Sequence, residues 1–171
     1  DLQNVLLTEL DGFSDRSNIA VICATNRKDL LDPAFLQRIS DLEIFVGPPD
    51  KEAAWEIFNI HLPPELPFHS NGKPANIVRE EMITSAVSRI YTPNADNMVC
   101  TLKLRNGEVR KIHARDLASG RLFEQVCRNA RQSALIRQMR GGKALGYSDM
   151  SMAVAEFIDK LRTTLTPRNA H

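Results

Sequence analysis

The segment Gly47-Pro48-Pro49 divides the chain into two stretches with different hydrophobic patterns, and this division most constrains the fold. Before it, residues 19–24 form an unbroken apolar run, which is typical of a strand buried on both faces of a parallel sheet. We expect a second strand at 42–46, and between the two a helix that Asp32 caps and Pro33 opens. After the prolines, apolar residues recur at helical spacing instead.

The second stretch predicts a helical domain with one β-hairpin inserted in it. Asn106-Gly107 lies between two short strand-like runs and is the strongest short-range signal for a hairpin, here at about 98–113. The predicted fold class is therefore α/β, with a partial parallel sheet at 1–48, joined to an α-helical domain at 49–171. Helices are expected at 1–11, 50–61, 77–91, 119–140 and 148–161.

Composition and charge exclude several classes of function. The 171 residues carry a formal net charge of +1, which gives no bulk attraction to nucleic acid or to an anionic membrane. No apolar run approaches the roughly 20 residues of a membrane helix, and no signal peptide is visible. The three cysteines lie far apart and predict free thiols in the cytoplasm, while the four scattered histidines predict no metal site. Because the chain opens inside a helix without Met, we expect it to be part of a longer protein.

Asn26 is the first candidate for chemistry, because it follows the apolar strand directly. In parallel α/β sheets, ligands bind beyond the carboxyl ends of the strands. A side-chain amide in that place could bind a nucleotide γ-phosphate or orient the water that attacks it. The alternative is that Asn26 is only a turn residue.

Ser119-Gly120-Arg121 is the second candidate, at the start of a predicted helix. The first turn of a helix offers free N–H groups and a partial positive charge, which suit a phosphate. Arg121 adds a guanidinium that can bind such a group through two hydrogen bonds. The alternative is a capped helix with a solvated arginine. Four more arginines follow on this helix and predict a solvated face or a contact surface: Arg128, Arg131, Arg137 and Arg140.

The order of the elements in the first fifty residues resembles the second region of homology of the AAA ATPases. The matching pieces are Leu10-Asp11-Gly12, the apolar strand, Ala24-Thr25-Asn26-Arg27, Leu31-Asp32-Pro33-Ala34 and Arg38. The resemblance implies that Asn26 is the sensor-1 residue and that the parent protein hydrolyses ATP with Mg²⁺. The Walker A and B motifs would precede residue 1, and no GxxxxGK[ST] occurs in the chain. We therefore expect this chain to be inactive by itself.

The same resemblance implies roles for two arginines. Arg38 is the candidate arginine finger, which would reach the nucleotide of a neighbouring subunit. The chain departs from the family here, since its motif is about two residues shorter and has one arginine where the family often has two. Arg38 could instead pair with Asp41, and Arg27 is a weaker candidate. Ser119-Gly120-Arg121 resembles the sensor-2 position of AAA lids.

The helical stretch resembles the lid of bacterial proteasome-associated ATPases of the ARC/Mpa type, which carry a hairpin just before the lid's Ser-Gly helix. This resemblance implies a cytoplasmic, hexameric ring that unfolds protein substrates, with the proteasome core as a further partner. Phe45 to Pro49 and Ser119-Gly120-Arg121 also resemble AAA ATPases that remodel HORMA-domain proteins. We rank the proteasomal type first because of the hairpin. A non-catalytic interaction module with a degenerate AAA fold is a third alternative.

Overall fold

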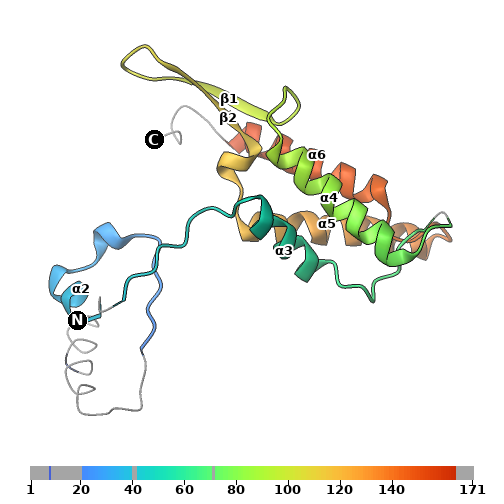
Figure 1. Cartoon of the computed structure of the whole chain (residues 1–171), viewed down its shortest axis with the longest axis horizontal. Helices are drawn as coiled ribbons and strands as arrows, with labels where there is room; N and C mark the ends of the chain where they lie inside the picture. Colours follow the sequence, from blue (N-terminus) through green and yellow to red (C-terminus); the bar gives the residue numbers. More distant parts are fainter. Residues whose placement is uncertain (1–7, 9–20, 40–41, 71, 165–171) are drawn as a thin grey trace. The chain divides into compact units, whose positions relative to one another are not determined.

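The computed structural model describes residues 8, 21–39, 42–70 and 72–164. The chain forms two compact units, Asp1–Val46 and Gly47–His171 (Figure 1). Each unit has its own packing and is described by itself.

The first unit contains a 3₁₀ turn, η1 (Lys28–Leu30), and a short helix, α2 (Pro33–Ile39). The Asp32 carboxylate accepts a hydrogen bond of 2.7 Å from the backbone N–H of Ala34, as a helix cap does. Pro33 occupies the first helical position, where its missing N–H leaves no bond unmade. The helix start predicted at Asp32-Pro33 is thus confirmed.

The two strands expected in this unit are not formed by its described residues. The described parts of them, 21–24 and 42–46, carry no strand assignment. Their apolar side chains are uncovered, with Ile22 93% and Phe45 89% exposed. A parallel strand takes its hydrogen bonds from neighbouring strands, and the described residues of this unit offer none to either segment. The helix expected at 1–11 lies outside the described residues except for Thr8, which is helical.

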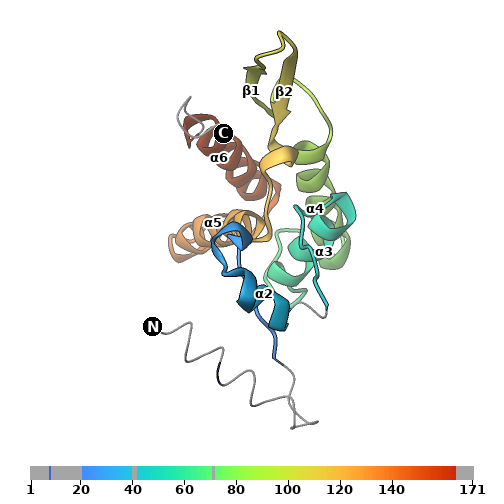
Figure 2. The same ribbon diagram turned by 90° about the vertical axis from the view of Figure 1, so that its left-hand side faces the viewer.

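The second unit is a bundle of four helices. Its helices are α3 (Lys51–His61), α4 (Ala75–Tyr91), α5 (Gly120–Met139) and α6 (Tyr147–Thr164) (Figures 1 and 2). The longest of them, α5, packs against both α3 and α6, while α4 packs against α3 and α6. The centre of the bundle is filled by large side chains that are almost completely buried: Phe58, Met82, Ile83, Ile90, Phe123 and Val154. All four helices agree with the sequence expectations to within about three residues.

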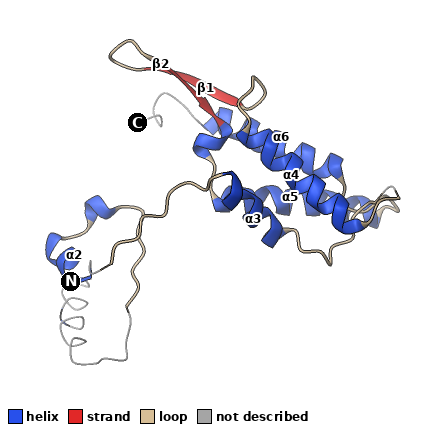
Figure 3. Ribbon diagram, viewed as in Figure 1, coloured by secondary structure: helices blue, strands red, loops and turns tan. Residues whose placement is uncertain are grey.

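The predicted hairpin is confirmed. Strands β1 (Met98–Lys103) and β2 (Val109–His113) pair antiparallel, with Lys103 opposite Val109 (Figure 3). At the tip, Leu104 N–H donates to the Glu108 carbonyl at 2.8 Å. Gly107 has φ of +85°, a left-handed conformation that favours glycine, and this explains why Asn-Gly marks the turn. Both views show the hairpin projecting beyond the helices of the bundle.

Asn97 fixes the base of the hairpin to the end of α4. Its side chain is fully buried, and its amide nitrogen donates to the carbonyls of Arg89, Ile90 and Thr92 at 3.0, 3.1 and 2.7 Å. The last carbonyls of a helix have no partner inside it, so Asn97 supplies the missing donor. On the other side, Ala114 N–H donates to the Asn97 carbonyl at 2.9 Å. A second turn, η2 (Ala114–Leu117), then leads to α5.

Candidate functional site

Asn26 lies in an exposed bend directly after the apolar segment 21–24. Thr25 Oγ1 accepts a hydrogen bond of 3.0 Å from the backbone N–H of Arg27, which closes the turn around Asn26. Within the described part of the chain, the Asn26 side-chain amide makes no hydrogen bond. Its donor and acceptor are therefore both available to a ligand, as the sensor-1 hypothesis requires.

Arg27 is committed to a neighbour. Its Nε and Nη2 donate to the Asp29 carboxylate at 2.9 and 2.8 Å. This two-point contact holds the pKa of Asp29 below its ordinary value, because the guanidinium stabilises the charged carboxylate. Arg27 thus supports the loop after Asn26, and its role as a finger candidate stays a prediction.

Arg38 lies near the end of α2. Its side chain is outside the described residues, and so is Asp41, the alternative partner. The finger role of Arg38 therefore stays a prediction.

Ser119 begins α5 as its N-cap. The backbone of Ser119 is extended, with φ of −145° and ψ of 159°, and its hydroxyl accepts from Leu122 N–H at 3.4 Å. Its carbonyl accepts from Leu122 and Phe123 at 3.0 and 3.1 Å. The N–H groups of Gly120 and Arg121 have no acceptor among the residues that the structure describes. They form an open donor pair at the positive end of a helix of 20 residues.

Core packing fixes the start of α5. Phe123 is fully buried, and its ring centroid lies 5.1 Å from that of Phe58 in α3 and 6.4 Å from that of Tyr91 in α4. Such aromatic contacts add to the stability that area burial gives. The donor pair at Gly120 and Arg121 is therefore held by two neighbouring helices and does not depend on the cap alone.

The Arg121 guanidinium is exposed, and its electrostatic attraction to Glu124 contributes to the lowered pKa of that carboxyl. Glu124, one turn further along α5, forms its ion pair with Arg128, which lowers the pKa of Glu124. In the described residues, Arg121 itself makes neither a hydrogen bond nor an ion pair. An arginine that faces solvent beside unpaired helix N–H groups can bind a phosphate or carboxylate through two hydrogen bonds.

The predicted site residues fall into both units. The structure brings Ser119, Gly120 and Arg121 together at one helix start, and it places Asn26 and the backbone of Arg38 in the other unit. That these two groups share one cleft stays a prediction. A surface hollow of about 750 Å³ along α4 contains none of these residues; its lining includes Glu81, Thr84, Ser88 and Arg89.

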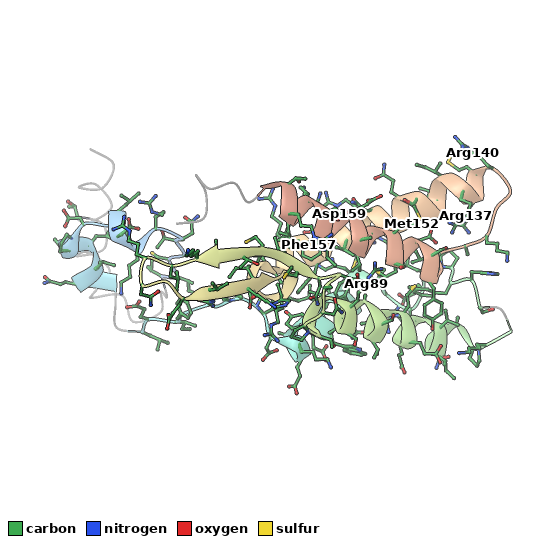
Figure 4. The ribbon with its side chains drawn as sticks, turned by 90° about the horizontal axis from the view of Figure 1, so that it is seen from above. Arg89, Arg137, Arg140, Met152, Phe157 and Asp159 are labelled. Atoms are coloured by element: carbon green, nitrogen blue, oxygen red, sulfur yellow. The ribbon has the colours of Figure 1, made fainter. Side chains whose placement is uncertain are left out.

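One arginine of the expected solvated face has a different role. Arg137 bridges α5 to the start of α6, where its Nη2 donates to the Asp149 carboxylate at 2.6 Å and to the Ala144 carbonyl at 2.9 Å. Asp149 is only 3% exposed, so it requires a cationic partner. The solvated-face interpretation is therefore wrong for Arg137, and Arg140 remains exposed nearby (Figure 4).

Tyr91 is a positioning residue that the sequence did not single out. Its hydroxyl donates to the Pro49 carbonyl at 2.6 Å and ties the end of α4 to the segment that joins the two units. Burial, with a contribution from Asp50, raises the pKa of Tyr91 to about 12. No short-range signal marks this contact, because 42 residues separate the partners.

Two further properties bear on the class of site. The described residues contain no group of three or more His, Cys, Asp or Glu side chains that could hold a metal ion. Among the helices of the same part of the chain, none has the length and apolar character that crossing a membrane requires.

Comparison with known families agrees with the resemblance found in the sequence. Residues 49–169 match the family described as "ARC, AAA+ ATPase lid domain". Residues 1–48 match the "ATPase family associated with various cellular activities (AAA)". These matches confirm an α/β unit followed by a helical lid with a hairpin, although the strands of the α/β unit are unpaired here.

Curated relatives point the same way. A proteasome-associated ATPase of Acidimicrobium ferrooxidans is 34% identical over 160 residues, which cover 88% of this chain and 28% of the relative. An "AAA ATPase forming ring-shaped complexes" of Kocuria rhizophila is 35% identical over 145 residues, or 81% of this chain and 25% of the relative. A proteasome-associated ATPase of Frankia casuarinae is 33% identical over 145 residues, or 81% and 24%. The chain spans about a quarter of the length of these relatives. It belongs to the AAA ATPase family and carries a lid of the ARC type.

Proposed function

We propose that the parent protein is a ring-forming ATPase that couples ATP hydrolysis to the unfolding of protein substrates, in association with a proteasome. The observation that carries this proposal is the uncommitted helix start at Ser119, Gly120 and Arg121 on an ARC-type lid. The ring and the proteasome are carried over from the printed names of relatives. A cytoplasmic location is proposed from the three free cysteines, Cys23, Cys100 and Cys127.

The residues of the lid suit a phosphate group. Two N–H groups without an acceptor in the described residues, and one exposed guanidinium that makes no hydrogen bond there, lie at the positive end of α5. In this proposal, Gly120 and Arg121 donate hydrogen bonds to the nucleotide phosphates and hold the lid against the bound nucleotide. Asn26 orients the attacking water from the α/β unit, and Arg38 stabilises charge on the nucleotide of the adjacent subunit. ATP supplies the phosphoryl group. Mg²⁺ would take its ligands from parts of the parent that precede residue 1.

The exposed apolar segments of the first unit support the same proposal. Ile22, Phe45 and Val46 are 87% exposed or more, although their segments have the apolar pattern of strands that are buried on both faces. We propose that further strands of the AAA α/β domain pair with 21–24 and 42–46 in the parent. Asn26 would then lie at the carboxyl edge of a complete sheet.

The hinge of the proposed cycle lies within Val46, Gly47 and Pro48. The units divide between Val46 and Gly47, and Tyr91 fixes Pro49 to the bundle. Rotation about the segment before Pro49 would move the whole lid as one body, so a change at the nucleotide would be transmitted to the bundle and its hairpin.

Arg121→Ala in the parent protein tests the role of the lid. We expect nucleotide affinity to fall about tenfold or more, because a charge-assisted contact of two hydrogen bonds is lost. The matched control is Arg140→Ala, which removes an exposed arginine from the other end of the same helix (Figure 4) and should leave affinity unchanged. Titration with a fluorescent ATP analogue measures both. Equal affinities for the two variants would contradict the proposal.

A second experiment separates the ATPase from the interaction module. The purified chain should show no ATP turnover, whereas the parent should show turnover that Arg38→Ala abolishes while nucleotide binding persists. Turnover by the chain alone, or loss of binding with normal turnover in Arg38→Ala, would count against the assigned roles. A parent without GxxxxGK[ST] before residue 1 would favour the interaction module.

A further inference from the structure

We propose that the β1–β2 hairpin is a docking arm for an extended acidic segment of a partner polypeptide, which pairs along one open edge of the hairpin. This inference concerns a surface distinct from the nucleotide site and goes beyond the ATPase function proposed above. It rests on the fixed base of the hairpin, its unpaired cations and its open strand edges.

The base of the hairpin is held rigidly by the bundle. Asn97 donates three hydrogen bonds to carbonyls at the end of α4. Arg162 of α6 donates to the carbonyls of Met98 and Asp96 at 3.1 and 2.5 Å. His113 N–H donates to the Asp116 carboxylate at 2.8 Å. An isolated two-stranded hairpin has only marginal stability in water. These contacts with the bundle therefore stabilise the hairpin and fix its base.

The outer part of the hairpin is strongly basic. Between residues 98 and 113 the one acidic residue is Glu108, against four Lys and Arg residues, so the segment has an excess of three positive charges. The whole chain has a net charge of only +1. All four cationic side chains are exposed, and none forms a hydrogen bond or ion pair with any residue that the structure describes: Lys103, Arg105, Arg110 and Lys111. A cluster of unpaired like charges attracts an anionic partner.

The two edges of the hairpin are open for backbone pairing. Leu104 N–H donates inward to the Glu108 carbonyl, and inward-facing and outward-facing residue pairs alternate along antiparallel strands. The backbone groups of Thr101 and Lys103 on β1, and of Val109 and Lys111 on β2, therefore point outward. In the described part of the chain the sheet has no third strand.

The lysines on these edges determine which kind of strand can pair with the hairpin. A strand edge that carries lysine repels a second copy of itself, which prevents self-association through the edge. The same lysines favour a strand with acidic residues at alternate positions. Lys103 lies on β1 and Lys111 on β2, and both side chains are exposed, so each edge combines outward backbone groups with one nearby cation. The charge of the edges therefore disfavours edge-to-edge pairing of two hairpins and favours pairing with an acidic segment.

A polypeptide fits this surface better than a nucleic acid. Binding of single-stranded nucleic acid relies on aromatic side chains on which bases stack, and residues 98–113 contain no Phe, Tyr or Trp. Pairing along a strand edge supplies backbone hydrogen bonds, and neighbouring side chains add specificity. Val109 and Leu104 are 61% and 43% exposed and offer apolar contacts beside the cations.

Fluorescence anisotropy with defined probes tests the proposal on the intact chain. The probes are a labelled peptide of about twelve residues with alternating Glu and Thr, the matching Lys–Thr peptide, and an oligonucleotide of about twelve thymidines. We expect the acidic peptide to bind, and Lys103→Glu/Lys111→Glu to weaken binding by about tenfold or more. Arg131→Glu/Arg140→Glu makes the same change of charge on α5 and should alter affinity less than about twofold.

Two proline variants test the backbone pairing. Thr101→Pro removes an outward N–H from the β1 edge, and Val109→Pro removes one from the β2 edge, without changing charge. One of them, on the edge used, should weaken binding about tenfold, and the other should not. Amide hydrogen exchange of the unaltered chain provides an independent readout: the peptide should slow exchange at the outward amides of one strand only.

Three results would overturn the proposal. The first is affinity for the acidic peptide that the hairpin charges do not affect. The second is exchange at the outward amides that stays unchanged at saturation. The third is tighter binding of the oligonucleotide with both proline variants unaffected, which would assign the arm to nucleic acid. None of these measurements involves a nucleotide cofactor, so their failure is distinguishable from failure of the ATPase proposal.

Discussion

The hydroxyl of Tyr91 donates a hydrogen bond of 2.6 Å to the carbonyl of Pro49 and joins the last turn of α4 to the connection between the two units. The Tyr91 ring also packs near Phe123, at the start of α5. One side chain thus links the inter-unit segment to the helix that carries the proposed phosphate contacts.

Tyr91→Phe should destabilise the lid by about 1 kcal/mol, because the Pro49 carbonyl loses its donor while the ring packing stays. Urea unfolding measures the change. The control is Tyr147→Phe, at the only other tyrosine, whose hydroxyl donates to the half-exposed carboxylate of Glu81. It should change stability by less than about 0.5 kcal/mol. An equal loss of stability in the two variants would show that the contact with Pro49 contributes no more than the exposed contact of Tyr147.

Asp149→Asn should destabilise the bundle by about 1.5 to 3 kcal/mol, because Asp149 is 3% exposed and loses its charge-assisted hydrogen bonds with Arg137, whose side chain is 36% exposed. Burial opposes ionisation of Asp149, but hydrogen bonds from Arg137 and Gly146 N–H outweigh it and hold the pKa of Asp149 below its ordinary value. Its stabilising contribution is therefore complete above about pH 4 and is lost as the pH falls through the lowered pKa.

Urea unfolding at pH 7 and pH 3 checks both parts of this prediction. The difference between Asp149→Asn and the unaltered chain should shrink at the lower pH. Asp159→Asn is the matched control, since Asp159 is an exposed partner of Arg162. This substitution should change the free energy of unfolding by less than about 0.5 kcal/mol. A difference that stays constant between the two pH values would refute the role of the charge.

Asn97→Ala should lower the free energy of unfolding by about 3 kcal/mol, because three carbonyls at the end of α4 lose a buried donor. The hairpin should also loosen, which hydrogen exchange at Ala114 N–H would report. Asn106→Ala at the exposed tip, where the amide bonds only within the turn, should cost less than about 1 kcal/mol. Unchanged exchange at Ala114 would contradict the proposed anchoring of the base.

Cys127 should resist alkylation in the folded chain. Burial raises the pKa of this thiol to about 12, so almost no thiolate exists at neutral pH. Cys23 is exposed and should react first. Mass spectrometry after brief treatment with iodoacetamide, with and without urea, distinguishes the two sites. Native labelling of Cys127 as fast as that of Cys23 would contradict the packing around α5.

Local signals allowed much of the lid to be predicted. Ser119 and Asp50 act as helix caps through their own side chains, and Gly107 closes the hairpin through a backbone conformation that favours glycine. Each of these features depends on residues within about four positions of one another, so a short stretch of sequence is enough to predict it.

Features that depend on distant partners could not be predicted in the same way. The sequence predicted that Arg137 is one of several solvated arginines. Its contact with Asp149 could not be predicted, because the two residues are 12 positions apart and meet only in the folded chain. The contact between Tyr91 and Pro49 spans 42 residues and has no local signature. The described residues 21–24 and 42–46 have the apolar pattern of strands but carry no strand assignment, because a strand also needs neighbouring strands with which to pair.

The two units differ in how completely they bury their apolar residues, and this difference has a practical consequence. The bundle from Gly47 onward encloses its own aromatic centre, whereas Ile22 and Phe45 lie open to water in the preceding unit. We therefore expect the lid to fold by itself and to be suitable for separate expression. The preceding segment, expressed without a covering sheet, would be prone to aggregation.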